Sequence, residues 1–233
     1  MPAFHRPPPE FFFYFILMAA FWLTLSFGVY FAITAYQKRR EWEDAPWVGA
    51  IRKIVEAESA DPPAALPVQI MPHLLLGDKE CASKVEALTA KGVTHVLNCA
   101  GRDGRDVATY KKYREVGIET ESIDEAEDTE GYPLLYAHQL TASKFIEQAK
   151  RSGGVCLIHC MAGINRSGAL AIAELMTHER ISVVDAVREV KRARGVVLQN
   201  QSFQCQLVQM ARREGLLGDR PEAEPAAEAK KTK

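Results

Sequence analysis

The sequence predicts an α/β domain with a mostly parallel central sheet flanked by helices, together with one N-terminal transmembrane helix. Short apolar runs alternate with helical patterns between residues 66 and 217, an order typical of buried parallel strands joined by helices. Before this region, residues 11–36 contain no charged side chain. The chain is 47% hydrophobic and 25% charged, which excludes a wholly disordered, collagen-like or polytopic membrane protein.

Charge and cysteine usage narrow the range of partners. The chain has 29 basic and 30 acidic residues and a net charge of -1, so nothing favours nucleic acid as a partner. Five cysteines without a C-x-x-C pair argue against a disulfide framework or a zinc site and favour a reducing compartment. The histidines show no metal-ligand spacing. We therefore expect neither a metal nor a cofactor.

The apolar run 11–36 predicts a single-span membrane anchor. As a helix, its 26 residues would extend about 39 Å at roughly 1.5 Å per residue, more than the ~30 Å hydrocarbon core of a bilayer. A cleaved signal peptide would have a basic start and a shorter apolar stretch. The basic cluster 38–40 comes directly after the run. The positive-inside tendency then places the C-terminal bulk in the cytoplasm and the short segment 1–10 on the other side.

Residues 37–65 are expected to form a juxtamembrane linker that contains one amphipathic helix. The residues with helical spacing are Trp47, Ile51, Ile54, Val55 and Glu58, with Asp44 as a candidate cap and Pro46 in the first turn. Two interpretations stay open: the helix lies on the membrane surface, or it packs on the following domain. At the other end, residues 218–233 lack apolar periodicity and are expected to form a disordered tail.

Four strands and six helices are expected between residues 66 and 217. Apolar runs at 73–76, 93–97 and 155–158 predict buried strands, and an alternating run at 118–123 predicts a strand nearer an edge. Helical patterns cover 81–90, 106–115, 133–151, 167–179, 182–194 and 201–214. Ser182 and Asp185 match a capping box for one of the late helices.

The most informative segment runs from Val155 to Gly168 and reads VCLIHCMAGINRSG. An apolar strand ends in His-Cys, and after five residues an Arg-Ser pair opens a helix that is apolar almost all round. Loops between a strand end and a helix N-terminus bind ligands in open α/β folds, and their N–H groups and helix dipole suit a phosphate. We expect the phosphate to be bound by Met161, Ala162, Gly163, Ile164, Asn165 and Arg166.

The same segment provides a candidate nucleophile, Cys160. Helix N-termini and neighbouring arginines favour the thiolate form of a cysteine, and a thiolate can attack phosphorus and take the phosphoryl group. Ser167 can donate a hydrogen bond to the sulfur. Arg166 offers a planar fork of donors for two phosphate oxygens.

This segment resembles the active-site loop of the cysteine-dependent protein tyrosine phosphatases, and that of the dual-specificity phosphatases most closely. The resemblance extends over about 66–217. Residues 72–77, 92–98 and 200–207 resemble the opening strand, the second strand and the late Asn-x-x-Phe-x-x-Gln-Leu stretch of that family. Asn165 is a departure, since many members have Ser there. The resemblance implies a protein tyrosine phosphatase-like fold and hydrolysis of phosphorylated protein substrates through a cysteinyl-phosphate intermediate.

Phosphate-ester hydrolysis also needs an acid for the leaving oxygen and a base for water. The acidic stretch 124–130 comes after the alternating strand, and the resemblance places the acid on this loop, about thirty residues before the cysteine. Asp128 matches that position best, and Asp124 is the reserve candidate. The other carboxylates of the stretch are expected to be solvated.

Several residues are assigned supporting roles. His159 is expected to shape the loop by hydrogen bonding, and Asn200 to brace it. Cys99 and Cys156 lie at or near strand ends, where each could form a protective disulfide with Cys160 or simply be a small buried residue.

Three functions are compatible with these features. The first is a membrane-anchored dual-specificity protein phosphatase. A phosphoinositide phosphatase would use the same chemistry, but its polyphosphorylated substrate would favour extra Lys or Arg in a loop whose positions 161, 162, 164 and 165 are uncharged. A non-catalytic phospho-residue binding module would be expected to lack Cys160 or Asp128. The sequence favours the first.

Overall fold

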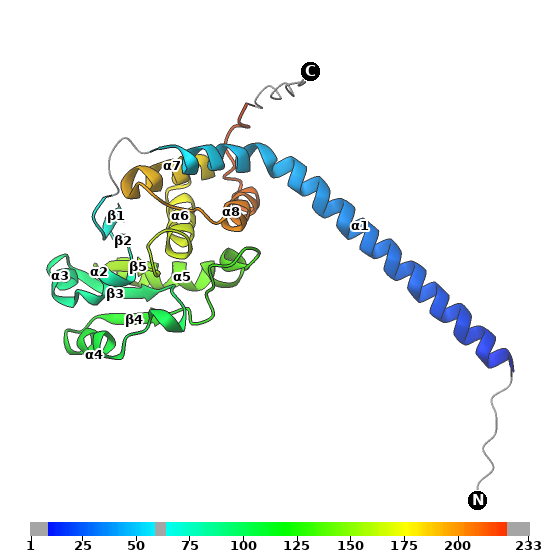
Figure 1. The fold of residues 1–233 in the computed structure, drawn as a ribbon, viewed down its shortest axis with the longest axis horizontal. Coiled ribbons are helices and arrows are strands. Elements are labelled where there is room, and N and C mark those ends of the chain that lie inside the picture. Colours follow the sequence, from blue (N-terminus) through cyan, green and yellow to red (C-terminus); the bar gives the residue numbers. More distant parts are fainter. Residues whose placement is uncertain (1–8, 59–63, 223–233) are drawn as a thin grey trace, which may run out of the picture. The chain divides into compact units, whose positions relative to one another are not determined.

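The computed structural model describes residues 9–58 and 64–222. The chain divides into two compact units, Met1–Ala45 and Pro46–Lys233. The second unit is built around one five-stranded sheet with helices on both of its faces (Figure 1). Residues 1–8, 59–63 and 223–233, which include most of the predicted tail and part of the predicted linker, lie outside the described residues.

The sheet has the strand order β1-β2-β5-β3-β4. Its strands are β1 (Val68–Met71), β2 (Leu74–Gly77), β3 (Val93–Asn98), β4 (Glu119–Ser122) and β5 (Val155–His159). β2, β5, β3 and β4 pair in parallel, whereas β1 pairs antiparallel with β2 because only two residues connect them. The sheet is therefore mixed, which corrects the prediction of a mostly parallel one. The four predicted strands are confirmed, and β1 is an additional strand.

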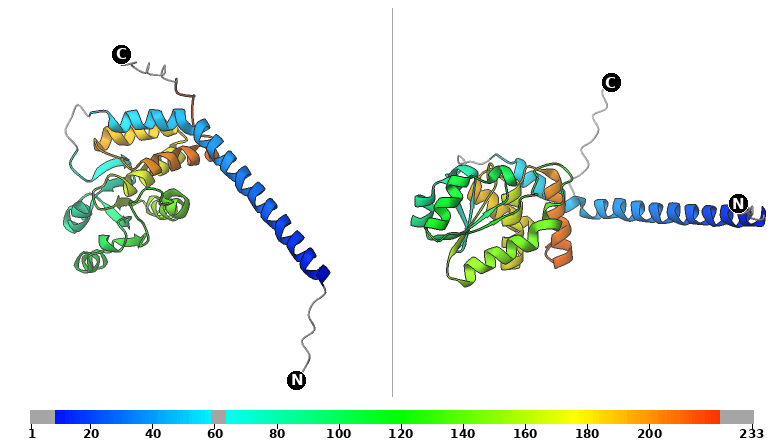
Figure 2. Two further views of the ribbon diagram at one scale, coloured as in Figure 1. Left: turned by 45° about the vertical axis from the view of Figure 1, so that its right-hand side comes forward. Right: turned by 90° about the horizontal axis from the view of Figure 1, so that it is seen from below.

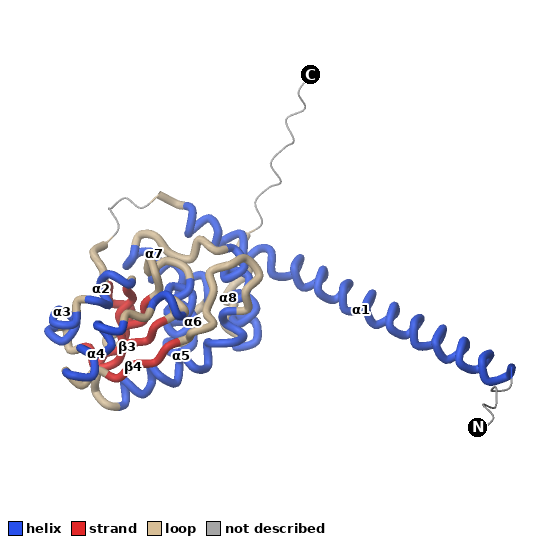
Figure 3. The backbone as a smooth tube through the Cα atoms, turned by 60° about the horizontal axis from the view of Figure 1, so that its bottom comes forward, coloured by secondary structure: helices blue, strands red, loops and turns tan. Residues whose placement is uncertain are grey.

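Helices cover both faces of this sheet (Figures 2 and 3), and a hydrophobic core lies under the helices of each face. The larger core lies under α5 (Leu134–Arg151), α6 (Arg166–Glu179), α7 (Val183–Arg194) and α8 (Gln201–Glu214), and the smaller under α2 (Lys79–Ser83), α3 (Val85–Ala90) and α4 (Val107–Glu115). Along β5, Cys156 and Ile158 enter the larger core and Leu157 enters the smaller one. Burial on both faces explains why β2 and β5 are almost continuously apolar in the sequence.

Five of the six predicted helices appear with nearly the predicted bounds. The pattern over 81–90 corresponds to two short helices, because Lys84 between α2 and α3 adopts a non-helical backbone conformation with φ -89° and ψ 66°. At the start of α7, the Ser182 hydroxyl accepts a hydrogen bond from the Asp185 N–H, as the predicted cap requires.

A single helix, α1 (Pro9–Glu56), covers the predicted span and most of the predicted linker. Its last turns belong to the second unit, where Trp47 and Ile51 are buried in the larger core. The Lys191 ammonium group donates to the Val55 carbonyl at 2.9 Å, and the Arg212 guanidinium lies 5.8 Å from the centre of the Trp47 ring. Of the two open interpretations, packing on the domain is confirmed. The predicted helix start at Asp44 is wrong. Both Asp44 and Pro46 lie inside the continuous helix α1.

Residues 11–36 lie within α1. Within the described residues, no helix has both the length and the apolar content that are needed to cross a bilayer. The predicted transmembrane helix is therefore not supported by the structure.

The docking of the end of α1 can be tested by a cavity mutation. Ile51 is fully buried, so Ile51→Ala should lower the free energy of unfolding by roughly 2–5 kcal/mol. Gly49→Ala on the same turns is the matched control, because a Cβ there meets no atom within 4 Å. It should be neutral or stabilise by up to about 1 kcal/mol through helix propensity. Equal effects of both substitutions in chemical unfolding would contradict this docking.

Candidate active site

The candidate site lies at the carboxyl edge of the sheet, in the loop between β5 and α6. β5 ends at His159, which pairs with Gly77 of β2 and Asn98 of β3, so three parallel strands end together there. Cys160 comes next in the chain and is only 2% exposed. The first residue of α6 is Arg166, so the phosphate-binding segment predicted from the sequence connects a buried strand to a buried helix. This is the place where open α/β sheets bind ligands.

The backbone of this loop, which we call the catalytic loop (160–165), is fixed from behind. Its carbonyls at Met161, Ala162, Gly163 and Ile164 accept hydrogen bonds from the Lys79 N–H (3.2 Å), the Arg194 guanidinium (3.3 Å twice) and the Leu198 N–H (2.9 Å). Gly163 has φ +63°, and a Cβ there would lie 2.7 Å from the Gly77 carbonyl oxygen. Donors from the surrounding structure thus bind four consecutive carbonyls of the loop. The N–H groups of the loop remain available to an anion.

Ser167 and Cys160 are in direct contact. The Ser167 hydroxyl donates to the Cys160 sulfur at 3.1 Å, and Ser167 is completely buried. Both lie at the N-terminus of α6, a helix of 14 residues, where the helix dipole favours negative charge. The predicted hydrogen bond to the sulfur is therefore present.

Arg166 is buried beside the loop and connects it to the acidic segment. One of its terminal nitrogens, Nη1, donates to the Ala126 carbonyl at 3.1 Å. Among the described residues its Nε has no hydrogen-bond partner although it is buried. A buried guanidinium donor without a partner is costly, so this N–H is available to an oxygen of a bound phosphate.

Asp128 is held against the catalytic loop by two asparagine side chains. Its carboxylate oxygens accept from the Asn165 amide and the Asn200 amide, each at 3.2 Å. The Asn200 N–H donates to the Asn165 side-chain oxygen at 3.1 Å, which closes the triangle. The reserve candidate, Asp124, instead accepts from the Ser122 hydroxyl at 2.6 Å and pairs with Arg105 at 3.2 Å. Of the two carboxylates, the structure brings Asp128 to the loop.

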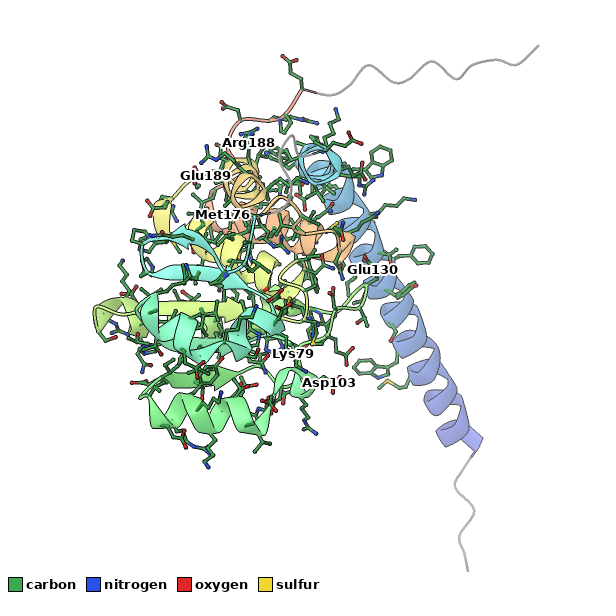
Figure 4. All side chains as sticks on the ribbon, turned by 60° about the vertical axis from the view of Figure 1, so that its left-hand side comes forward. Lys79, Asp103, Glu130, Met176, Arg188 and Glu189 are labelled. Carbon is green, nitrogen blue, oxygen red and sulfur yellow. The ribbon has the colours of Figure 1, made fainter. Side chains whose placement is uncertain are left out.

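The segment 126–135, which we call the acid loop, is also attached to α8. The Glu130 carboxylate accepts from the N–H groups of Gln201 (3.1 Å) and Ser202 (3.0 Å) at the start of α8. The Gln206 side chain donates to the Tyr132 carbonyl at 2.7 Å and accepts from the Leu135 N–H at 3.0 Å. Figure 4 labels Glu130 on this loop. These contacts hold the chain on the C-terminal side of Asp128, and the hydrogen bond from Arg166 to the Ala126 carbonyl holds it on the N-terminal side.

His159 is 2% exposed, and its Nδ1 lies 3.4 Å from the Cys160 carbonyl oxygen. Burial lowers the pKa of His159 to about 4, so the ring is neutral at physiological pH. A neutral, buried ring fits the predicted role in shaping the loop rather than in transferring protons.

The five cysteines are all free. Cys99 lies directly after β3, and its N–H donates to the His159 carbonyl at 2.7 Å, next to Cys160. Burial raises the pKa of the Cys99 and Cys156 thiols, which is typical of small buried residues. No cluster of three or more metal-ligating side chains occurs in the described part of the chain.

Some contributors were not found by sequence reasoning. Arg194, Glu130 and Gln206 act across 31 to 74 positions of sequence separation, and no local spacing connects them to the loop. Gln206 lies in the Asn-x-x-Phe-x-x-Gln-Leu stretch, which could have drawn attention to it. Asn165 was predicted as a phosphate-binding position and as a departure from the family pattern, but its connection of the catalytic loop to Asp128 was not predicted.

Comparison with known proteins agrees with this geometry. Residues 74–213 match the family described as "Dual specificity phosphatase, catalytic domain". The chain belongs to the dual specificity phosphatase family. Cattle (Bos taurus) dual specificity protein phosphatase 26 is 36% identical over 146 residues, which cover 62% of this chain and 67% of that protein. Human dual specificity protein phosphatase 2 is 35% identical over 143 residues, 61% of this chain and 43% of its own length.

Solved structures resemble the same region. Human DUSP28 shares 30% identity with a TM-score of 0.54, and the match covers 67% of this chain and 98% of that one. A mouse putative dual specificity phosphatase complexed with zinc tungstate shares 29% identity with a TM-score of 0.55 over 68% of this chain and 93% of that one. The chain therefore contains a dual specificity protein phosphatase catalytic domain.

The attachment of the acid loop to α8 can be tested kinetically. With Asp128 as the general acid, Glu130→Ala should loosen the loop and slow turnover of phenyl phosphate about 10-fold, a fraction of the 10²–10⁴ that an acid can contribute. Turnover of 4-nitrophenyl phosphate, whose leaving group needs little protonation, should change much less. Glu125→Ala, at an exposed position of the segment before the loop, is the control. Equal slowing of both substrates would contradict a role in placing the acid.

Proposed function

We propose that this phosphatase hydrolyses phosphotyrosine, phosphoserine or phosphothreonine in proteins through a phosphate ester of Cys160. The observation that supports it most is the convergence of three groups on one loop. The Cys160 sulfur accepts from Ser167, the Arg166 guanidinium retains a free buried donor, and Asp128 is bound to Asn165 of the same loop. A nucleophile, an anion-binding donor and an acid are the groups that phosphoryl transfer requires.

In the first step, the substrate phosphate lies in the catalytic loop with its oxygens on backbone N–H groups and on Arg166. The Cys160 thiolate attacks phosphorus, an S–P bond forms and the P–O bond to the substrate breaks. The leaving oxygen takes a proton from the Asp128 carboxylic acid and departs as a neutral hydroxyl group. Protonation of the leaving group is the role that general acids play in such reactions.

In the second step, Asp128 is a carboxylate and accepts a proton from water as the water oxygen attacks phosphorus. The S–P bond breaks, inorganic phosphate forms and Cys160 returns to a thiolate. The hydrogen bond from Ser167, at 3.1 Å, stabilises this departing sulfur. The electron pair of the S–P bond stays on sulfur. The step therefore changes no oxidation state and needs no redox cofactor.

A phosphoinositide substrate is less well supported. The catalytic-loop positions Met161, Ala162, Ile164 and Asn165 are uncharged, so the loop offers Arg166 as its cation to a headgroup with several phosphates. A phosphate-release panel of phosphotyrosine, phosphothreonine and phosphoinositide substrates separates the two functions. Faster turnover of the phosphoinositide would overturn the protein-substrate proposal.

Cys160→Ser should abolish turnover and preserve binding of a phosphopeptide. A hydroxyl group is a far weaker nucleophile than a thiolate, whereas the N–H groups and Arg166 that hold the phosphate are unchanged. Phosphate release and peptide binding are measured in parallel. Cys205→Ser, at an exposed cysteine of α8, is the control and should keep wild-type turnover. Substantial phosphate release by Cys160→Ser would exclude this residue as the nucleophile.

Asp128→Asn should slow turnover of phosphotyrosine by about 10²-fold or more, the usual contribution of a general acid. The loss should shrink with 4-nitrophenyl phosphate. Asp124→Asn removes a carboxylate that pairs with Arg105 instead, so it should retain most of the activity. The reverse pattern would assign the acid role to Asp124.

We also infer that residues 11–36 hold the catalytic domain at a membrane, on its cytoplasmic side. The run has no charge and precedes three basic residues, 38–40, a pattern that favours a cytoplasmic location for the domain on their C-terminal side. Described apolar side chains in this run, such as Trp22, Tyr30 and Phe31, are exposed. Exposed apolar side chains in such numbers mark a surface that a membrane or a partner covers.

The membrane proposal predicts that the full chain stays with sealed vesicles during an alkaline carbonate wash. With the cytoplasmic face outward, added protease should digest the catalytic domain. Release by carbonate would contradict anchoring, and full protection of the domain would contradict the orientation.

A further inference from the structure

A pocket of about 570 Å³ lies beside the catalytic loop, on the α2–α4 side of the sheet. Its walls come from α2, from α4 and the segment that leads into it, and from the two neighbours of Cys160 in the chain. The lining includes Lys79, Glu80, Arg105, Asp106, His159 and Met161. Neither step of the phosphoryl transfer uses this pocket.

The pocket is close enough to receive a part of the substrate next to the phosphorylated residue. His159 and Met161 are the chain neighbours of Cys160, and both line the pocket; Met161 is 44% exposed. An extended peptide advances about 3.3–3.6 Å per residue. A side chain one or two positions from the phosphoresidue therefore reaches this volume.

Most of the charges in the lining are already engaged. Glu80 pairs with Lys84 at 2.6 Å, and Arg105 pairs with Asp124 at 3.2 Å. The Asp106 carboxylate caps α4, where it accepts from the N–H and the hydroxyl of Thr109 at 2.8 Å and 2.6 Å.

Lys79 differs from these residues. Its ammonium group donates to the Asp103 carbonyl at 2.6 Å, which is a neutral acceptor, and Figure 4 shows the two residues next to each other at the rim of the domain. An ammonium group has three N–H donors, so donors beyond the one that binds the Asp103 carbonyl remain available to a ligand. Its main chain is fixed by the hydrogen bond from the Lys79 N–H to the Met161 carbonyl at 3.2 Å. The main chain of Lys79 is thus attached to the catalytic loop, and the Asp103 carbonyl holds its ammonium group.

We propose that this pocket is a substrate subsite in which Lys79 binds an anionic group close to the phosphorylated residue. The group is a carboxylate of a neighbouring Asp or Glu, or a second phosphate, since both present oxygens to an ammonium group. The inference rests on the proposed phosphatase function and names its substrate class: phosphopeptides that carry a second negative charge near the scissile phosphate.

The test uses the full chain and phosphotyrosine peptides that differ at the neighbouring positions, with Glu, a second phosphate, Gln or Lys. Wild type should show kcat/KM about 10-fold higher for the acidic peptides than for the Lys peptide, a ratio that one desolvated charge pair can supply. Lys79→Met, which keeps the aliphatic stem, should remove this preference, and Lys79→Glu should reverse it. The Glu and phosphate arms show which anion is preferred.

Lys91→Glu, an exposed lysine at the end of α3 outside the pocket, is the matched control for charge and should leave the preference intact. Phenyl phosphate has no neighbouring group, so Lys79→Met should change its turnover much less than the turnover of the acidic peptides. If the Lys79→Glu variant still prefers acidic peptides, the subsite is wrong while the phosphatase function stands. If wild type fails to hydrolyse phenyl phosphate and every peptide, the proposed function itself is wrong.

Discussion

Both oxygens of the Asp128 carboxylate accept a hydrogen bond from an asparagine amide, one from the catalytic loop and one from the residue that caps α8. This contact joins three segments that are far apart in the sequence: the β5–α6 loop, the acid loop and the start of α8. Without it, the acid loop would be an exposed acidic segment with nothing to orient a particular carboxylate. With it, Asp128 is fixed against the catalytic loop before any substrate arrives, and preorganisation of this kind would lower the cost of reaching the transition state of the proposed reaction.

The catalytic loop depends in turn on the buried structure behind it. Arg194 and Leu198 hold its carbonyls from the α7–α8 side, and Leu198 does so with φ +59°. A left-handed conformation at a branched residue is unfavourable, and it persists here because the Leu198 N–H is engaged and the side chain is completely buried. Strain of this kind is concentrated at functional sites where the surrounding structure determines the conformation. The larger core therefore supports the geometry of the catalytic loop as well as the stability of the fold.

Sequence reasoning succeeded where the signal is local. The short, largely apolar runs of β2, β3 and β5 identified the strands of the sheet, and the adjacent residues of the catalytic loop identified the site. β1 was not predicted because it is a four-residue edge strand that contains Gln69 and is too short to show a periodic pattern. The continuity of α1 was not predicted, because Pro46 suggested that a second helix starts there. The contacts of Glu130 and Arg194 could not be predicted, because they depend on how distant segments pack.

The proposed chemistry requires that Cys160 carries the phosphoryl group during turnover. The most direct measurement is mass spectrometry of the protein after acid quenching of a reaction with a phosphotyrosine peptide in its first turnovers. In wild type, the peptide that contains Cys160 should gain the mass of one phosphoryl group, and in Cys160→Ser it should gain none. A reaction that releases phosphate while the Cys160 peptide stays unmodified at every time point would contradict this mechanism.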